Sequence, residues 1–470
     1  MPEKYHININ ETPARFPLVS KYAIVETREK CTGSCRKCVR KNCAFGVFKL
    51  NSHNMQKAKE RQYLYGCEGC FRCVQECPGG VFSRVKNPDW DNLGGGYWTP
   101  DIIHQTWKQA ENGRVPVSGA GYRGKFAACG FDSIWTDMSE IVRPTRDGIH
   151  GREYINTSVD INRRPHHLSF SQDGKLDRSY TTVVEIPIPL LFEVPKFGII
   201  NRRVLNAMVS AASELETLMF LRPEEYSDDL EPLASSIVPR LKASNQVQFN
   251  NLIKKCRIVE IDYCENILQI IIAAKTINPD VLISVGIELD GKAVERAIET
   301  SELDEVDLLH FYADANGNGL GSNQPRFLSS LIQEMHSALV ERGLRFRTNL
   351  VFSGGIALAE HLAKAIIYGA DALAISTPLL LALECHMCYR CLSGESCPVS
   401  MEEIPENWGR QRILNLAGAW RDQLIEVMGA MGIREARRLR GDIGRSMCFE
   451  NLEKECFGPI FGKSVAKGSV

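Results

Sequence analysis

The sequence has no surplus of charge of either sign. Its 470 residues include 56 lysines and arginines against 57 aspartates and glutamates, which gives a formal net charge of −1. A protein that binds nucleic acid or an anionic membrane surface usually carries a basic surplus. We therefore expect neither nucleic acid nor a membrane as a partner.

The sequence also lacks a long apolar run and a secretory leader. Its longest mainly apolar stretches, such as residues 183–194, are much shorter than the roughly 20 residues of a membrane-spanning helix. The N-terminus, Met-Pro-Glu-Lys-Tyr-His, has neither the charged start nor the apolar stretch of a signal peptide. These absences predict a cytoplasmic protein. In that reducing compartment, cysteines serve as metal ligands or free thiols rather than as disulfides.

Cysteine is the residue that the sequence has in excess, and twelve of its 17 cysteines fall into three tight groups. The first two groups are Cys31, Cys35, Cys38 and Cys43, followed by Cys67, Cys70, Cys73 and Cys77. The second group has the Cys-x2-Cys-x2-Cys-x3-Cys-Pro spacing of a bacterial ferredoxin, and the first is a looser version of it. A Gly-Val-Phe phrase follows both groups. The repeat predicts a ferredoxin-like domain over residues 1–90 with two [4Fe-4S] clusters.

In such pseudo-symmetric domains, the fourth cysteine of each run completes the other cluster. We therefore assign one cluster to Cys31, Cys35, Cys38 and Cys77, and the other to Cys67, Cys70, Cys73 and Cys43. The exchange of the fourth cysteine is expected because a cubic [4Fe-4S] cluster needs four thiolates from different directions, and one short loop can supply only about three of them. Zinc is the alternative, but zinc sites favour two Cys-x2-Cys pairs separated by a longer spacer.

Residues 181–377 alternate between strand-like and helix-like patterns. The apolar, β-rich runs are 182–192, 257–263, 281–289, 306–314, 348–353 and 370–376. At least six β/α units favour a closed (β/α)8 TIM barrel over an open doubly wound sheet, which remains the alternative. We expect the barrel domain over 181–445, a connector packed on it over 91–180, and a C-terminal tail over 446–470.

Three loops after the later predicted strands have features of a phosphate or cofactor site. A Ser-Gly-Gly loop follows the run 348–353 and leads into a helix predicted at 357–368. Backbone N–H groups without bulky side chains are therefore expected to point to one place there. A Ser-Thr turn ends the run 370–376, and a glycine-rich loop follows the run 306–314. A common tight turn is the alternative for Gly-Gly. The cofactor-binding candidates are Ser353, Gly354, Gly355, Ser376, Thr377, Asn316, Gly317 and Gly319.

The third cysteine group comes directly after the Ser-Thr turn and comprises Cys385, Cys388, Cys391 and Cys397, before Pro398. A Ser-Gly-Gly-Ile loop, a Gly-Ala-Asp-Ala strand, a Ser-Thr turn and a cysteine run ending in Cys-Pro, in that order, resemble the FMN-binding domain of glutamate synthase. The segment 138–153 resembles a connector found in related proteins. The ferredoxin-like N-terminus resembles the archaeal-type enzyme in particular.

The resemblance implies an oxidoreductase that acts on CH-NH2 donors. In that family, FMN reduces an imine formed from 2-oxoglutarate and ammonia, with electrons relayed by an iron-sulfur cluster beside the flavin. By this resemblance, the third cysteine group would bind an iron-sulfur cluster. The cluster would be a [3Fe-4S] cluster as in some relatives, or a [4Fe-4S] cluster because Cys388 supplies a fourth thiol. The Gly-Gly loop and the Ser-Thr turn would hold the FMN phosphate, and the glycine-rich loop after 306–314 would lie on the substrate side. The ferredoxin-type clusters would pass electrons through the third cluster to FMN and on to an imine or carbonyl substrate.

The chain also departs from the family pattern. It shows no amidotransferase domain and no pyridine nucleotide domain, which implies a separate glutaminase and a reductase or electron-donor subunit as partners. Gly286 stands where the family has a lysine near the flavin, and the family's glycine-rich phrases are not found between residues 193 and 255. The alternative is therefore an iron-sulfur electron-transfer subunit of a larger redox complex, with a degenerate barrel.

Single residues give weaker signals. Glu288, at the end of its strand, is a candidate catalytic acid, whereas His310 is interpreted as a satisfied core histidine. Cys256 and Cys264 are interpreted as packing thiols. A formal dinucleotide fingerprint at 119–124 lacks the strand and helix that such a site needs, so we expect a loop there instead of NAD binding. Four residues could bind an anion or form ion pairs: Arg143, Arg146, His150 and Arg152.

Overall fold

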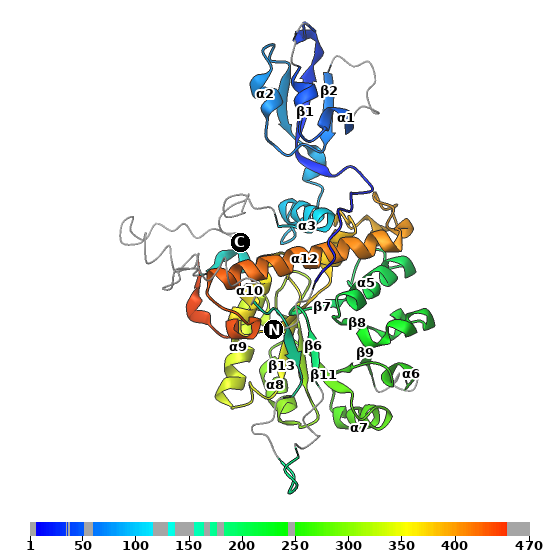
Figure 1. Cartoon of the computed structure of the whole chain (residues 1–470), viewed down its shortest axis with the longest axis vertical. Coiled ribbons are helices and arrows are strands. Elements are labelled where there is room, and N and C mark those ends of the chain that lie inside the picture. Colours follow the sequence, from blue (N-terminus) through cyan, green and yellow to red (C-terminus); the bar gives the residue numbers. More distant parts are fainter. Residues whose placement is uncertain are drawn as a thin grey trace, which may run out of the picture.

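The computed structural model describes residues 6–33, 35, 38–50, 60–115, 130–136, 155–163, 170–175, 183–242 and 250–448. A barrel surrounded by helices forms the larger part, and a small sheet stands at one end of it (Figure 1). None of the helices in these ranges is long and apolar enough to cross a membrane. The fingerprint at 119–124, the connector at 138–153 and its four polar candidates lie outside the described residues.

Eight parallel strands close into a barrel in the order β10-β11-β12-β13-β14-β7-β8-β9. They are β7 (Leu190–Glu193), β8 (Met219–Leu221), β9 (Ile237–Leu241), β10 (Ile258–Asp262), β11 (Leu282–Glu288), β12 (Leu308–Tyr312), β13 (Asn349–Ser353) and β14 (Ala372–Ile375). The predicted (β/α)8 barrel is confirmed, and the open doubly wound sheet is excluded.

The structure corrects part of the strand assignment. The run 182–192 is two strands: β6 (Val184–Ile186) pairs with β5 (Val159–Ile161) outside the barrel, and β7 enters it. Pro187 and Pro189 lie between them, and proline removes a ladder donor. Strands β8 and β9 were not predicted from the sequence. β8 has only three residues, and β9 carries Pro239 and an arginine, so neither forms a clear apolar run.

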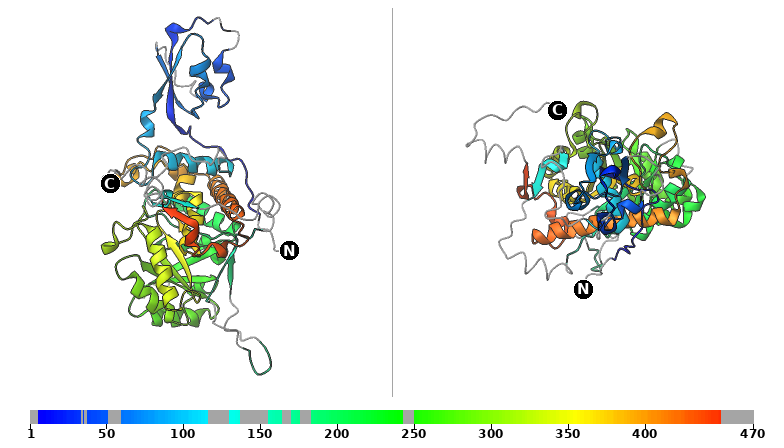
Figure 2. Two further views of the ribbon diagram at one scale, coloured as in Figure 1. Left: turned by 90° about the vertical axis from the view of Figure 1, so that its left-hand side faces the viewer. Right: turned by 90° about the horizontal axis from the view of Figure 1, so that it is seen from above.

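Helices cover the outside of the barrel (Figure 2). They are α5 (Arg202–Glu214), α6 (Asn250–Ile253), α7 (Ile267–Ile277), α8 (Ala293–Glu302), α9 (Leu328–Glu341), α10 (Ala359–Tyr368), α11 (Thr377–Ala382) and α12 (Glu406–Ala430). Between β8 and β9, the 3-10 helix η9 (Asp228–Ser236) takes the place of an α-helix. Helix α10 begins two residues later than predicted, so the Gly-Gly loop is separate from the helix.

The second unit, which we call the N-terminal lobe, comprises residues 19–86. Its antiparallel sheet has the order β2-β1-β3, formed by β2 (Glu60–Tyr65), β1 (Val19–Thr27) and β3 (Phe82–Lys86), with α1 (Val47–Leu50) and α2 (Arg72–Glu76) beside it. Its own small core comprises Ile24, Val39, Val47, Tyr63, Val81 and Phe82. Several cysteines of the first two groups pack against the edge of that core.

A helix that the sequence did not predict joins the two units. This helix, α3 (Pro100–Asn112), begins with Pro100 after the N-cap Thr99, whose side chain accepts a hydrogen bond from the amide of Ile102. It ends at Gly113, whose φ of 67° suits glycine. One face of α3 is buried against α11 and α12. With the preceding η4 (Pro88–Trp90), it forms what we call the bridge segment, residues 88–112.

Candidate functional site

The Gly-Gly loop after β13 packs closely against the loop after β12. Both glycines have positive φ, 101° at Gly354 and 65° at Gly355. A Cβ at Gly354 would lie 2.3 Å from the carbonyl oxygen of Asp314, and one at Gly355 would lie 2.4 Å from Cα of Gly317. The glycines are therefore required by the contact between the two loops, whatever ligand they bind.

The same loops leave donors available at the carboxyl end of the barrel. Among the described residues, the amides of Gly354 and Gly355 donate no hydrogen bond. On the neighbouring strand, Ser376 stands at the start of α11 but its side chain does not cap that helix, and Thr377 is buried beside it. Free amides and hydroxyls at the ends of adjacent strands suit a phosphate group. Phosphate binding by these residues stays a prediction.

The third cysteine group surrounds one pocket. Cys385, Cys388, Cys391 and Cys397 all line it, together with Phe197, Tyr389 and Met401. The loop turns sharply because Met387 and Tyr389 have positive φ, and the amide of Met387 donates to Sγ of Cys385 over 3.4 Å. Burial, and then the neighbouring thiols of Cys397 and Cys388, raise the pKa of Cys385 to about 12. Without a bound positive charge, this thiol stays protonated at neutral pH.

A second pocket with four cysteines lies in the N-terminal lobe. Cys43 of the first group lines it with Cys67, Cys70 and Cys73 of the second. This is the set assigned to one cluster by the crossing of the two runs. Burial raises the pKa of Cys73 to about 11. At the other end of the lobe, a Cβ at Gly79 would lie 3.1 Å from the carbonyl oxygen of Lys30, so the chain after Cys77 lies near the first group.

No three His, Cys, Asp or Glu side chains among the described residues converge closely enough to hold a metal ion. The thiols of each pocket instead line a shared space. Zinc would need its four thiolates within about 2.3 Å of one point, whereas a cluster places iron and sulfide between them. The iron-sulfur assignment therefore stays a prediction, made from spacing and from these two pockets.

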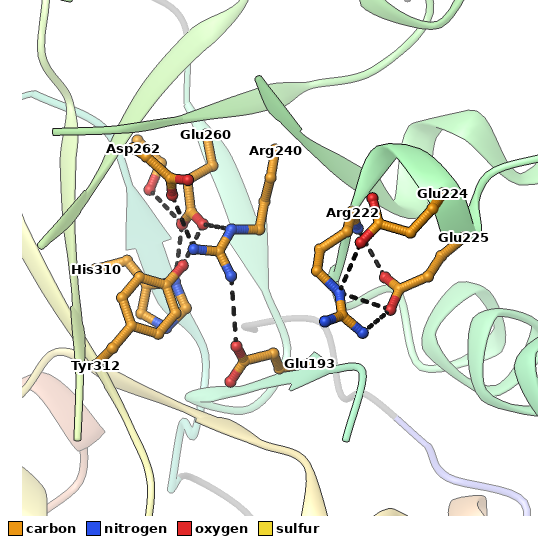
Figure 3. A network of polar contacts seen from close by, with 10 residues as sticks. Glu193, Arg222, Glu224, Glu225, Arg240, Glu260, Asp262, His310 and Tyr312 are labelled. Carbon is orange, nitrogen blue, oxygen red and sulfur yellow. Dashed lines mark hydrogen bonds and ion pairs between the residues drawn. The ribbon is translucent and has the colours of Figure 1, made fainter. Parts of the chain in front are cut away.

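The barrel interior contains a charged network that the sequence did not reveal (Figure 3). Arg240, from β9, lies 3.0 Å from Glu260 and 2.8 Å from Asp262, both from β10. Its guanidinium is also 3.7 Å from Glu193 at the end of β7. Glu260 is fully buried, and burial alone would raise its pKa; His310 and Arg240 outweigh that effect and lower the pKa. The signal in the sequence was the pair of acidic residues, Glu260 and Asp262, inside the apolar strand pattern 257–263.

His310 and Tyr312 of β12 complete this network, which we call the mouth network (Arg240, Glu260, Asp262, His310 and Tyr312). Nδ1 of His310 lies 2.8 Å from Glu260, and the Tyr312 hydroxyl donates to the same carboxylate. Burial, followed by the Glu260 charge, raises the pKa of Tyr312 well above its usual value. The interpretation of His310 as a satisfied core histidine is half wrong: it is buried, but Nε2 has no partner among the described residues.

Glu288 and Gly286 lie beside this network on β11. Glu288 pairs in register with Tyr312, but its side chain points to solvent and joins no described ion pair. A Cβ at Gly286 would lie 3.0 Å from the Tyr312 ring and 3.3 Å from Asp262. The mouth network therefore fills the space that a longer side chain at Gly286 would need. The structure brings Gly286 into the site and leaves Glu288 on the rim.

The remaining sequence candidates occupy supporting positions. Asp314 accepts hydrogen bonds from the amides of Asn316 and Asn318, at 2.9 Å and 2.7 Å, which shapes the loop after β12. Gly319 packs against Asn323 in the same loop. Cys256 is buried in the barrel core, which raises the pKa of its thiol to about 12, so its interpretation as a packing thiol is confirmed.

Known proteins resemble this chain over most of its length. Residues 250–434 match the family described as the conserved region in glutamate synthase. An archaeal-type glutamate synthase (NADPH) from Dehalococcoides mccartyi is 24% identical over 482 residues, covering 90% of this chain and 94% of that protein. An archaeal glutamate synthase (NADPH) from Archaeoglobus fulgidus is 23% identical over 511 residues, covering 94% and 97%. Residues 250–434 therefore match the conserved region of glutamate synthases, and the chain as a whole is similar to archaeal-type glutamate synthases.

Proposed function

We propose that the protein is an iron-sulfur flavoprotein oxidoreductase of the glutamate synthase type. One observation carries the proposal: the pocket with four cysteines is lined by Leu380 of α11, the helix that starts at the Ser376-Thr377 turn, and Cys385 packs in one cluster with Ala357 and Leu358, which follow the Gly-Gly loop. Bound FMN would supply the hydride chemistry, and the chain would position it and exclude water. The family match and the names of the relatives support an oxidoreductase of this kind.

The residues at the carboxyl end of the barrel fit a flavin phosphate. The free amides of Gly354 and Gly355 and the hydroxyls of Ser376 and Thr377 would hold it. The cysteines would hold three clusters: two in the N-terminal lobe, and one of three or four irons in the pocket of Cys385. An imine or carbonyl compound would approach over the mouth network, with 2-oxoglutarate and ammonia as the first pair to test. Separate glutaminase and reductase partners belong to the same proposal.

Substitution of Thr377 tests flavin binding without disturbing the loops. Thr377→Val keeps the shape of the side chain, whereas any side chain at Gly354 would collide with Asp314 and damage the fold. We expect Thr377→Val, combined with Ser376→Ala, to weaken FMN binding by about tenfold or more, because hydrogen bonds to a charged group contribute about 1.5–3 kcal/mol each. Thr276→Val on α7 is the matched control. FMN affinity of the deflavinated protein, measured by fluorescence titration, should fall in the first variant alone.

Reoxidation of the reduced protein tests the substrate. After anaerobic reduction, addition of 2-oxoglutarate with ammonia should restore the oxidised flavin spectrum and form glutamate. If neither compound nor other oxo acids reoxidise a protein that holds FMN, the proposed reaction is wrong although the cofactor assignment stands.

One observation favours the alternative, an iron-sulfur electron-transfer subunit. Tyr312 and Asp262 fill the space at Gly286, and three carboxylates surround the one arginine of the mouth network. Such a mouth has little net positive charge for a reduced flavin or a dicarboxylate. Protein that retains its full iron but binds no FMN would support this alternative.

A further inference from the structure

The bridge segment holds the base of the N-terminal lobe through charged and polar contacts. Lys108 of α3 pairs with Glu68 over 2.8 Å, and Glu68 lines the pocket of Cys43, Cys67, Cys70 and Cys73. Asp101 of α3 pairs with Lys21 of β1 over 3.0 Å. Beside them, the amide of Cys67 donates to the Ser20 hydroxyl over 2.7 Å. That pocket therefore lies at the end of the lobe that faces α3.

The first cysteine group begins, at Cys31, beyond the end of β1 that points away from the bridge segment, although its last member, Cys43, lines the pocket just described. Strand β1 starts at the bridge segment and runs nine residues before Cys31, which at about 3.3 Å per residue spans roughly 30 Å. Figures 1 and 2 show the sheet standing on α3 with its far end away from the barrel. The pocket of Cys43, Cys67, Cys70 and Cys73 is thus closer to the barrel than Cys31 is, and we call it the near pocket.

The same bridge segment contacts three loops at the carboxyl end of the barrel. The amide of Gly94 donates to the carbonyl of His386, inside the third cysteine group, over 3.1 Å. The Tyr97 hydroxyl donates to the carbonyl of Gly355 over 2.6 Å, and Nε1 of Trp98 donates to the carbonyl of Ala315 over 3.0 Å. One segment therefore fixes the lobe, the third cysteine pocket and the Gly-Gly loop relative to one another.

A continuous packed cluster runs through this junction. It joins Val19 and Tyr65 of the lobe to Trp107 of α3 and to Met387 and Cys385 of the third group. The Trp107 ring lies 5.2 Å from the His386 ring. The indole N–H of Trp107 is buried with no acceptor among the described residues, which is unfavourable unless an acceptor binds there. A cluster in the adjoining pocket would offer sulfur acceptors.

We propose that the bridge segment is the electron-transfer junction of the molecule: it docks the near cysteine pocket of the lobe onto the third cysteine pocket, with Trp107 and His386 at the contact. The proposal rests on the proposed function. A cluster held by Cys43, Cys67, Cys70 and Cys73 would be oxidised by one electron as a cluster held by the third group is reduced, with no bond formed or broken. The electron comes from an external one-electron donor that reduces the lobe.

The two ion pairs add to the packed cluster in fixing the orientation of the lobe. Electron tunnelling falls exponentially with distance, so a change in that orientation should slow the transfer. Reversing both charges on α3, by Lys108→Glu with Asp101→Lys, should repel Glu68 and Lys21 without touching a cysteine or the packed cluster. The complementary reversal, Glu68→Lys with Lys21→Glu, restores both pairs when all four changes are combined. Lys255→Glu, which reverses an exposed pair with Glu231 on the barrel, is the matched control.

The experiment uses the anaerobic holoprotein, with iron and sulfide measured first in every variant. A brief reducing pulse delivers less than one electron per molecule, and rapid freezing with electron paramagnetic resonance follows the signal of the third cluster. We expect a wild-type phase whose rate is independent of protein concentration. The α3 double variant should lose that phase or slow it by an order of magnitude or more, and the fourfold variant should recover most of the rate.

An unchanged rate in the α3 double variant, with full iron content, would overturn the junction while leaving the proposed function intact. Replacement of Trp107 by Phe gives a second readout: loss of the indole donor should lower the reduction potential of the third cluster, because hydrogen bonds to the sulfurs set that potential. An unchanged potential would remove Trp107 from the contact. Wild-type protein without iron would overturn both the junction and the proposed function.

Discussion

The N-terminal lobe and the barrel bury their chemistry in opposite ways. The lobe has a core of six buried side chains and places its cysteines around that core, half-buried or exposed. The barrel has an extended apolar core and places a paired charged network inside it. A small core rarely suffices for independent stability, so we expect the lobe to depend on the proposed clusters to fold, whereas the barrel stabilises its own polar groups by pairing them.

The largest expected effect is loss of the lobe when iron is removed. Metal binding free energy is folding free energy in small metal domains, so anaerobic chelation should unfold residues 19–86 and leave the barrel strands folded. Hydrogen exchange measured by mass spectrometry would show protection lost over β1, β2 and β3 but kept over β10 to β14. Equal protection of the lobe with and without iron would show that the lobe, like the barrel, folds without a metal, and would contradict the difference between the two regions.

The next effect is on the mouth network. Arg240→Met should lower the free energy of unfolding of the barrel by about 3 kcal/mol, because Glu260 and Asp262 would remain buried or half-buried without their cation. Arg222→Met, which removes a half-exposed arginine paired with Glu225 on the rim, should cost less than about 1 kcal/mol. Urea denaturation of both variants makes the comparison. Similar losses would mean that the network is a surface feature.

A smaller effect concerns pH. The folded-state pKa of Glu260 is lowered, so its contribution to stability is present above its ordinary value of 4.5 and is lost as the pH falls through the lower folded value. Glu260→Gln should therefore make the acid loss of stability shallower, although it weakens the fold at neutral pH. Glu231→Gln, on the surface, should keep the wild-type slope. Denaturation midpoints between about pH 7 and about pH 3 test this.

The smallest effect separates packing thiols from cluster thiols. Cys256→Ala should lower the free energy of unfolding by about 1 kcal/mol and leave the iron content unchanged, since Cys256 packs in the barrel core. Cys385→Ala should instead reduce the iron content, because Cys385 lines the third pocket. Iron lost from the Cys256 variant would place that thiol at a cluster and contradict its role in packing.

The same difference explains what could be predicted from the sequence. Each cysteine group is contiguous, so its spacing alone points to a site, and four cysteines from the first two groups do line one pocket. The barrel could be predicted because long apolar strands alternate with helices. The mouth network could not, because Arg240, Glu260 and His310 come from three strands and meet only when the barrel closes.

Two elements show where the sequence was ambiguous. Strand β9 was hidden because a proline and an arginine interrupt its apolar pattern, and that arginine is the centre of the network. The Gly-Gly loop suggested a phosphate site, yet its glycines are already required by contact with Gly317 and Asp314. A Gly-Gly loop therefore indicates first that two backbone segments lie close together, and only then, with further evidence, that a ligand binds there.

The most direct test of the account is the content of iron, acid-labile sulfide and FMN in anaerobically purified protein. Two four-iron clusters and a third cluster of three or four irons predict about 11–12 iron atoms per chain, and the flavin site predicts about one FMN. Full iron without FMN would contradict the flavoenzyme and leave an electron-transfer subunit. Protein with zinc in place of iron would contradict the account of all three cysteine groups.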